Sequence, residues 1–517
     1  MNGDVTKTDV IIIGAGPTGL ALACQFIRYG IDFVIVDKKE TTTPFSKAIG
    51  VQARTLEIYE QIGLADKLIE RGAIAEKARM VIGGKIRGEA TFREFGSGMS
   101  PYPFVLIVEQ GKHEALVYDF IRSQGRDVEW QTELQSFTQD DSSVRAVVRK
   151  AGGEAKTIEA KFLVGCDGAK SPVRHSLGLT FEGSTFERMF YVADVDIDWA
   201  FDHDAVTVMP LKSNLLAFFP MSGDRQWRIV GTFPEEFAKD EGEVLYEEIE
   251  EQIKRDSELD LDITAVNWFS TYKVHTRHVN RFSEGRCFLA GDAAHIHTPA
   301  GAQGMNTGIQ DAYNLAWKLA MVLRGAVKDE ILASYNEERL ENAQNLLETT
   351  DRFFNLVASP EPLLTFLRMH VFPYVAGVAF SLDAVKKFLF PRVSQIGINY
   401  RGHSLSDHNG DADFDIKAGD RFPYFTVDGS SVFDRLREPK FHLLSFADGL
   451  GEVDGDGLDT KFNSIVDRHR IQIDSRIAEI FGTDKSFNAL LRPDNYIATI
   501  SQDTSLAPVE KYLEGCL

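Results

Sequence analysis

Residues 9–37 read DVIIIGAGPTGLALACQFIRYGIDFVIVD, and the rest of the chain is expected to be organised around this stretch. The β-branched run Val10–Ile13 predicts a strand that is buried on both faces. Gly14, Gly16 and Gly19 follow with the spacing G-x-G-x-x-G. A strand, a glycine-rich turn and a helix in this order are typical of the first unit of a doubly wound α/β domain.

The second half of the stretch supports the same prediction. Leu20–Phe26 continues as an apolar helix, Ile31–Val36 predicts a second buried strand, and Asp37 stands at its end. The middle glycine lets the backbone approach a pyrophosphate, the helix N-terminus offers N–H groups to phosphates, and the terminal acid accepts hydrogen bonds from ribose hydroxyls. The sequence therefore predicts a dinucleotide site, and Asp37 argues against a 2′-phosphate on that ribose.

Composition narrows the class of protein. The chain has 517 residues, enough for two or three domains, with 44% hydrophobic and 26% charged residues, as in ordinary globular proteins. Its net charge of −21 argues against a nucleic-acid or anionic-membrane partner. The apolar segment Phe372–Phe390 is interrupted by charges and predicts buried helices rather than a membrane span. The first residues lack the pattern of a signal peptide, and we expect a cytoplasmic protein.

The cysteines are widely scattered along the chain, with no C-x-x-C pair and no metal-ligand spacing. We therefore expect neither a disulfide framework nor a metal site, and a reducing compartment fits this usage. The cysteines are Cys24, Cys166, Cys287 and Cys516.

Two polar positions near the first unit have open interpretations. Lys47 and Arg54 lie before and at the start of a helix that apolar spacing predicts over about residues 55–63. They are either a solvated basic pair or two cations that face a pyrophosphate or a flavin, and spacing does not decide between these. Gln110 precedes a helix predicted from about Lys112 to Gln124. It is either a ligand contact or a helix cap, and spacing favours the cap.

A second motif, residues 162–174, reads FLVGCDGAKSPVR. A buried strand ends in Asp167 and Gly168, the glycine suits a sharp turn, and Ser171 with Pro172 can start a helix. Asp167 is either a ligand contact or a cap of that helix, and the residues alone leave both open.

A third motif, residues 285–308, reads GRCFLAGDAAHIHTPAGAQGMNTG. It predicts a strand that ends in Gly291 and Asp292, a tight glycine-rich and proline-containing loop, and a helix capped by Asn306 or Thr307. The positive end of that helix would suit an electron-rich flavin ring. The alternative is an ordinary turn before a core helix.

The three motifs, in this order, resemble those of the class A flavoprotein monooxygenases, the FAD-dependent aromatic hydroxylases of the para-hydroxybenzoate hydroxylase type. The resemblance runs from about Asp9 to Ala358. Within that family the chain is most similar to the phenol and polyketide hydroxylase branch, which carries a C-terminal thioredoxin-like domain. Residues 394–401 and 418–423 look like the entry of that branch into its tail.

The resemblance implies an enzyme that hydroxylates a phenolic or polyketide-like aromatic compound with O₂. It implies bound FAD, a flavin C4a-hydroperoxide, and NADPH or NADH as a transient electron donor that binds near Asp167. Pro299 matches the proline beside flavin and substrate and is the expected catalytic position, whereas Lys47 stands where the family usually has arginine. The implied FAD-binding residues are Gly14, Gly16, Gly19, Asp37, Lys47, Arg54, Gln110, Asp167, Gly168, Gly291, Asp292, Pro299, Gly304, Met305 and Asn306.

The expected fold is α/β, with a Rossmann-type FAD-binding domain interleaved with a substrate-binding β-sheet domain and followed by a thioredoxin-like domain. The FAD-binding domain is expected over residues 1–180 and 275–358. The substrate sheet is expected over 181–274 with part of 75–108, a helical connection over 359–405, and the tail over 406–517. Without a C-x-x-C pair, the tail is expected to serve packing or oligomer formation, so a homodimer is possible.

Strand-like runs in the middle of the chain place several large apolar residues at candidate substrate positions. Phe218, Phe219, Met221 and Trp227 are the candidates for lining an aromatic pocket. Large apolar residues are more often ordinary core, and that interpretation is favoured for most of them.

Two other functional classes stay open at this point. One is a flavoprotein that does not hydroxylate, such as a halogenase or a reductase, although no W-x-W-x-I-P element of the tryptophan halogenases occurs. The other is a binding protein that has lost catalysis, against which the intact Gly291–Asp292 loop and Pro299 argue.

Overall fold

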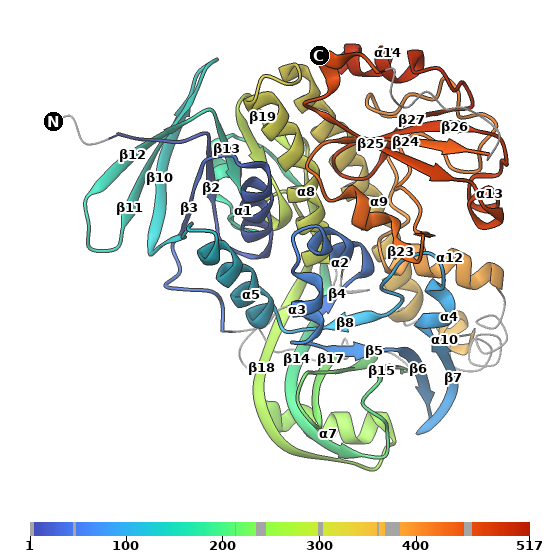
Figure 1. Cartoon of the computed structure of the whole chain (residues 1–517). Helices are drawn as coiled ribbons and strands as arrows, with labels where there is room; N and C mark the ends of the chain where they lie inside the picture. The colour runs from blue at the N-terminus through green and yellow to red at the C-terminus, as the bar shows by residue number, and fades with distance from the viewer. Residues whose placement is uncertain are drawn as a thin grey trace.

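The computed structural model describes residues 5–44, 48–211, 214–233, 244–297, 303–358, 361–367, 383–448 and 458–516. Lys47 and Pro299 lie outside these ranges, as does most of the apolar segment 372–390. Figure 1 shows the part that carries the three sequence motifs in the centre and at the left, a large curved sheet below it, and a C-terminal unit at the upper right. We call the first part the nucleotide-binding unit after its predicted site.

The first unit forms as predicted. The apolar run gives β2 (Val10–Ile13), which is completely buried and pairs in parallel with β3 (Phe33–Asp37), and α1 (Pro17–Tyr29) connects them. These strands belong to a sheet in the order β19-β20-β13-β2-β3-β9. Its further strands are β9 (Glu129–Trp130), β13 (Phe162–Gly165), β19 (Ser283–Glu284) and β20 (Cys287–Leu289). The carboxyl ends of β2, β13 and β20, which are parallel neighbours, therefore bring all three sequence motifs to one edge.

Smaller sheets and helices surround this layer. One sheet has the order β1-β12-β11-β10 and another the order β4-β8-β5. Their strands are β1 (Val5–Lys7), β4 (Gly50–Val51), β5 (Ala73–Ala75), β8 (Val105–Ile107), β10 (Thr132–Gln139), β11 (Val144–Lys150) and β12 (Ala155–Ala160). The helices are α2 (Ala53–Glu60), α3 (Ala65–Ile69), α4 (Phe92–Gly96), α5 (Gln110–Ser123) and α6 (Pro172–Ser176).

The curved sheet has the order β21-β18-β14-β17-β16-β15-β6-β7. Its two longest strands, β14 (Phe181–Trp199) and β18 (Leu261–Val279), pair antiparallel and run from the nucleotide-binding unit down into the sheet (Figure 1). The strands predicted in the middle of the chain are present, and α7 (Tyr246–Ser257) covers one face. The other strands are β6 (Lys77–Ile82), β7 (Lys85–Thr91), β15 (Ala205–Pro210), β16 (Leu215–Pro220), β17 (Gln226–Thr232) and β21 (His295–Ile296).

The helix after the third motif, α8 (Gly304–Leu323), is buried along most of its length and packs against α1. It begins at Gly304 after Gln303, so the prediction that Asn306 or Thr307 caps it is wrong. Likewise α5 begins at Gln110 after Glu109, so Gln110 is not the cap. Both helices start several residues before their periodic apolar positions begin, because the first turn of a helix needs no apolar side chains. The short helix η1 (Gly291–Ala293) precedes α8, and η3 (Asp329–Leu332), α9 (Ala333–Ala358), α10 (Pro362–Phe366) and α12 (Asp383–Val393) follow it.

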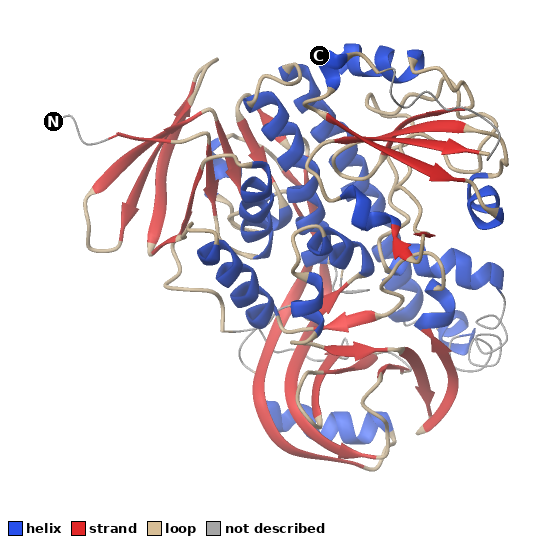
Figure 2. Cartoon of the chain, viewed as in Figure 1, coloured by secondary structure: helices blue, strands red, loops and turns tan. Residues whose placement is uncertain are grey.

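The C-terminal unit has a sheet in the order β25-β24-β26-β27, in which β24 and β25 are parallel and the other pairs antiparallel (Figure 2). A cluster of phenylalanines fills its core, with Phe446 and Phe487 stacked at 4.2 Å between ring centroids. Its elements are β22 (Thr426–Val427), β23 (Ser430–Ser431), η5 (Val432–Leu436), β24 (Phe441–Ala447), η6 (Thr460–Phe462), β25 (Val466–Gln472), α13 (Ser475–Phe481), β26 (Phe487–Leu491), β27 (Ile497–Ser501) and α14 (Ala507–Cys516). In the described part of the chain, no helix is apolar and long enough to span a bilayer.

A buried ionic cluster joins the C-terminal unit to α8 and α9. Glu338 lies 2.8 Å from Lys318 Nζ, and Arg492 donates to both oxygens of Glu338. Arg492 also pairs with Asp494, which accepts a hydrogen bond from Trp317 Nε1 at 3.0 Å. Burying a charge away from water costs free energy unless the charge is paired. Since the partners come from both units, this cluster holds the two units in one arrangement.

This cluster predicts how stability depends on acid. Burial alone would raise the pKa of the Glu338 carboxyl, but Arg492 and Lys318 outweigh burial and lower it from 4.5 to about 2. The lowered folded-state pKa means that the stabilisation is present above about pH 4.5 and is lost as the pH falls toward 2. We expect Glu338→Gln to reduce the free energy of unfolding at pH 7 by on the order of 3 kcal/mol. Denaturant unfolding should show this deficit shrinking between pH 4.5 and 2, and a pH-independent deficit would contradict the assignment.

Candidate functional site

The glycine loop after β2 is packed backbone against backbone. Gly14 has φ +102°, and a Cβ on it would lie 2.3 Å from the carbonyl oxygen of Cys166. A Cβ on Gly19 would lie 1.9 Å from the carbonyl oxygen of Gly14. A Cβ on Gly16, by contrast, would meet no atom of the described residues within 4 Å. The loop therefore presents open backbone at Gly16, where the dinucleotide motif requires close approach of a pyrophosphate.

Asp37 lies beside this loop and is fixed by hydrogen bonds. Its Oδ2 accepts a hydrogen bond from Ala15 N at 2.7 Å, and its Oδ1 accepts one from Lys39 N at 2.8 Å. The residue retains 8% exposure. A carboxylate fixed by two backbone donors keeps lone pairs for further acceptance, which suits the ribose hydroxyls of a nucleotide.

Asp167 serves one of its predicted roles and leaves room for the other. Its Oδ2 accepts a hydrogen bond from Val173 N at 3.1 Å and so caps α6 together with Ser171, whose Oγ accepts from Arg174 N. Its Oδ1 is buried and has no hydrogen-bond partner among the described residues. Burial raises the pKa of this carboxyl. An unpaired buried oxygen is costly, so a bound donor at this position would stabilise the site.

The Gly291–Asp292 loop meets α1 and α8 at close range. Gly291 has φ +62°, and a Cβ on Gly291 or on Gly308 would lie 2.4 Å from Thr18 Oγ1. A larger residue at either glycine would therefore force the Thr18 side chain of α1 to shift. Asp292, which directly follows Gly291, is exposed.

A carboxylate that sequence analysis missed anchors this loop. Asp311, fully buried on α8, accepts hydrogen bonds from Gly291 N at 2.9 Å, His295 Nε2 at 2.7 Å and Arg339 Nε at 2.7 Å. Arg339 donates in turn to Tyr400 Oη at 2.8 Å. Burial alone would raise the pKa of Asp311, but Arg339 and His295 outweigh it, so the pKa is lowered. An acid on a helix that is mostly apolar and buried was the signal available in the sequence.

Asn306 fixes the start of α8. Its Nδ2 donates to the Gly50 carbonyl at 2.8 Å, and its Oδ1 accepts from Gln52 N at 2.9 Å and from Thr55 Oγ1 at 2.8 Å. The side chain is thus used for structure. The N–H groups of a first helical turn have no partner within the helix itself, so the start of α8 at Gly304 suits the binding of a ligand.

Arg54 and Gln110 have protein partners in this structure. The Arg54 guanidinium donates to Glu57 Oε2 at 3.1 Å and to the Asp494 carbonyl at 2.9 Å, and it lies over the ring of Tyr496. Gln110 Nε2 donates to Glu114 Oε1 at 2.8 Å. Contacts of Arg54 and Gln110 with a cofactor stay predictions, and so do those of Lys47 and Pro299 outside the described residues.

The candidate substrate residues separate onto two faces of the curved sheet. Phe218 and Trp227 are 0% and 1% exposed and lie in the core that faces α7. Phe219 alternates to the opposite face, where it packs against a cluster formed by Ile49 and by residues of β5 and β8 of the nucleotide-binding unit. Met221 follows that strand and borders a cavity. Phe218 and Trp227 therefore serve the core in this structure, as the alternative interpretation expected, because successive strand residues point to opposite faces.

A cavity of about 510 Å³ lies between this second face and the start of α5. On its sheet side Arg228 pairs with Asp194 through two hydrogen bonds of 2.6 Å, and the Trp268 ring lies 5.3 Å from the guanidinium. The Trp268 ring, with the paired charges of Asp194 and Arg228 beside it, suits a flat aromatic ligand. The lining residues are Thr43, Pro44, Glu109, Gly111, Lys112, Ala115, Asp194, Met221, Gln226, Asn267 and Trp268.

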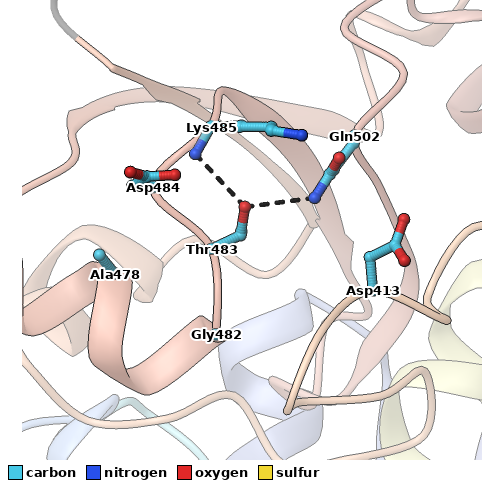
Figure 3. Close-up of a pocket in the computed structure, with 7 residues that line it drawn as sticks. All are labelled: Asp413, Ala478, Gly482, Thr483, Asp484, Lys485 and Gln502. Carbon is cyan, nitrogen blue, oxygen red and sulfur yellow. Dashed lines mark hydrogen bonds between the residues drawn. The ribbon is translucent and has the colours of Figure 1, made fainter.

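A second cavity, also of about 510 Å³, opens on the C-terminal unit (Figure 3). Within this lining, Thr483 Oγ1 accepts hydrogen bonds from Lys485 N and from Gln502 Nε2. It lies outside the three sequence motifs, and we assign it no part in the nucleotide site. Its lining residues are Asp413, Ala478, Gly482, Thr483, Asp484, Lys485 and Gln502.

Comparison with known proteins defines the class. The FAD binding domain family matches residues 7–350. A flavin-dependent monooxygenase of Mycobacteroides abscessus is 34% identical, over 84% of this chain and 88% of the relative. The 6-methylpretetramide 4-monooxygenase of Streptomyces rimosus is 30% identical, over 98% of this chain and 93% of the relative. The solved structure of OxyS anhydrotetracycline hydroxylase from Streptomyces rimosus is similar with a TM-score of 0.75 and 26% identity, over 99% of both chains.

The chain therefore belongs to the FAD-binding domain family, and it is an FAD-dependent monooxygenase of the class A type. The predictions of family, enzyme class and FAD cofactor are confirmed. The open backbone at Gly16, the fixed Asp37 and the unpaired Asp167 oxygen fit that cofactor. The comparisons give no support to the halogenase or reductase alternatives.

Proposed function

We propose that this monooxygenase hydroxylates a flat aromatic compound of the phenolic or polycyclic polyketide class, with O₂ as oxidant and NADPH or NADH as electron donor. The observation that carries the proposal is the cavity between the curved sheet and α5, with Trp268 on its wall. Two relatives matched over nearly the whole chain, the 6-methylpretetramide monooxygenase and the anhydrotetracycline hydroxylase, are named for polycyclic aromatic substrates. Their names support a substrate of that size.

The three motifs divide the binding of FAD between them in this proposal. Gly14, Gly16 and Gly19 with the α1 N-terminus hold the pyrophosphate, and Asp37 binds the ribose of the adenosine half. Asp292 binds the ribityl chain, and the N–H groups of Met305 and Asn306 face the flavin ring. Bound FAD supplies electron transfer and oxygen activation, for which this chain has no side-chain chemistry of its own.

The protein's own part in the reaction is to orient the substrate and exclude water. Trp268 and Met221 provide apolar parts of the lining, while Asp194, held by Arg228, offers a fixed polar group. Fixed groups orient a substrate at little entropic cost. The first turn of α8 stabilises negative charge that develops on the ring held in front of it. Pro299 is proposed to complete the wall between ring and substrate.

The C-terminal unit is proposed to be a thioredoxin-like domain without redox function. Its order β25-β24-β26-β27, with helices α13 and α14, supports this assignment. The one cysteine in this part of the chain, Cys516, has no second cysteine nearby in the sequence. The ionic cluster around Glu338 and Arg492 supports a role in packing. A homodimer stays a prediction.

The proposal is tested by supplying purified, FAD-loaded enzyme with NADPH or NADH and a panel of simple phenols, naphthacene-type polyketides and non-aromatic controls. We expect polycyclic aromatics to stimulate nicotinamide oxidation and to gain one oxygen atom by mass spectrometry. Stimulation and oxygen gain with non-aromatic compounds alone would refute the substrate class.

The cavity is tested separately by Met221→Trp, which fills space in the cavity that Met221 and Trp268 both line. Overpacking costs about 1–3 kcal/mol, so we expect KM for an aromatic substrate to rise roughly tenfold or more. Less product should form per NAD(P)H oxidised, because the poorly seated substrate leaves more peroxide as by-product. Met221→Leu conserves volume and serves as the control. Equal KM and coupling in Met221→Trp and Met221→Leu would place the substrate elsewhere.

A further inference from the structure

A cluster of two histidines and one carboxylate lies in the C-terminal unit, on the neighbouring parallel strands β24 and β25. His442 stands opposite Asp467, and His469 stands opposite Leu444 in the strand register. His442 is fully buried, whereas the side chains of His469 and Asp467 are 12% and 35% exposed. Neither the nucleotide site nor the substrate cavity uses these residues.

The donor atoms of the three side chains converge. His442 Nδ1 lies 3.1 Å from His469 Nε2 and 3.8 Å from Asp467 Oδ2, and His469 Nε2 lies 3.3 Å from that oxygen. In tetrahedral zinc sites the metal–nitrogen distance is about 2.0–2.1 Å, which places neighbouring ligand atoms about 3.3–3.4 Å apart. The three observed separations lie around this value, so one ion could contact all three atoms with little movement.

The chemical state of His442 suits a metal ligand. Its Nε2 lies 3.1 Å from the Glu438 carbonyl oxygen, which can only accept, so Nε2 carries the proton. Its Nδ1 is then the unprotonated nitrogen that faces His469 and Asp467. A ligating histidine whose other nitrogen donates to a carbonyl is the usual outer arrangement at metal sites.

We propose that His442, His469 and Asp467 form a binding site for one divalent transition-metal ion of the zinc type, with a fourth position open to solvent. Such an ion would join β24 to β25. It would also steady the segment before β24, where Arg28 of α1 donates to the carbonyls of Arg437 and Glu438. The site therefore lies at a contact between the C-terminal unit and the helix that starts at the nucleotide loop. Cysteine spacing could not reveal it, because none of its ligands is cysteine.

The test uses full-length, FAD-loaded protein that has been freed of metal and is then titrated with Zn²⁺ by calorimetry and with Co²⁺ by visible absorption. We expect one ion per chain, a tetrahedral-type Co²⁺ spectrum, and a higher unfolding temperature with Zn²⁺. His469→Ala and Asp467→Asn, at partly exposed positions, should each weaken binding at least about tenfold. His408→Ala removes a histidine outside the cluster, whose ring pairs with Asp411, and should leave binding unchanged.

Absence of Zn²⁺ and Co²⁺ binding by the wild-type chain would overturn the proposal. The cluster would then be a hydrogen-bonded triad in which a proton on His469 Nε2 is shared with Asp467 and His442. Binding that persists undiminished in both His469→Ala and Asp467→Asn would overturn it equally, since the ion would lie elsewhere. Both variants must keep wild-type flavin content, which shows that they are folded and separates this test from the activity of the enzyme.

Discussion

Asp311→Ala is expected to reduce the free energy of unfolding by about 3–5 kcal/mol and to weaken FAD binding. The substitution leaves the buried Arg339 without its carboxylate and removes the acceptor of Gly291 N–H. A hydrogen bond to a charged group contributes about 1.5–3 kcal/mol, so freeing the Gly291–Asp292 loop should raise the FAD dissociation constant roughly 10–100-fold. Denaturant unfolding and flavin titration of the apoprotein measure the two effects separately.

A second variant separates the contribution of the ion pair from that of the hydrogen bond at this position. Asp311→Asn keeps an oxygen that can accept from Gly291 N–H but loses the ion pair with Arg339. We therefore expect it to lose stability while retaining more FAD affinity than Asp311→Ala. Wild-type stability and flavin affinity in Asp311→Ala would show that this carboxylate does not position the loop.

Gly16→Ala and Gly19→Ala are expected to impair different properties. Gly19→Ala should lower the stability of the fold, and Gly16→Ala should weaken FAD binding. A methyl group at Gly19 would lie 1.9 Å from a backbone oxygen of the same loop, so the fold itself must shift, at a cost on the order of 3 kcal/mol. A methyl group at Gly16 meets no protein atom within 4 Å among the described residues, and the backbone there is extended. The apoprotein of Gly16→Ala should therefore keep its free energy of unfolding within about 0.5 kcal/mol.

The same methyl group at Gly16 would occupy space that the pyrophosphate needs. Overpacking of about 1–3 kcal/mol corresponds to a rise of roughly 10–100-fold in the FAD dissociation constant. Flavin titration and denaturant unfolding of both apoproteins test this pair of expectations. Undiminished FAD affinity in Gly16→Ala would remove this loop from the cofactor site.

The parts of the site that follow from local spacing could be predicted from the sequence. The glycine loop, Asp37, the Asp167 turn and the Gly291–Asp292 loop each depend on a strand followed directly by a turn, and the structure has these strands and turns where the pattern predicts them. Their convergence also follows, because parallel neighbouring strands end at the same edge of a sheet.

The parts of the site that depend on partners far away in the sequence could not be predicted. Asp311 bonds to Arg339, and Arg339 to Tyr400, and nothing in the spacing of these residues indicates their contact. Phe218 and Phe219 are adjacent and equally apolar, yet they face opposite sides of the sheet. Which of them turns toward the nucleotide-binding unit depends on strand register, which the pairing partners set.

Periodicity also misplaced the starts of two helices. Apolar spacing begins only where side chains meet the core, whereas α8 starts at Gly304 and uses Asn306 to bind β4 and α2. The polar residue expected as a cap thus performs a tertiary role that only the fold reveals.

We infer that this chain uses FAD to insert one atom of dioxygen into an aromatic substrate. The most direct measurement is mass spectrometry of the product formed by FAD-loaded enzyme, NAD(P)H and a stimulating aromatic compound under isotopically labelled dioxygen. We expect the product to carry one labelled oxygen atom and expect this labelling to require FAD. A product whose added oxygen comes from water, or consumption of labelled dioxygen that yields only peroxide with every stimulating aromatic compound, would contradict it.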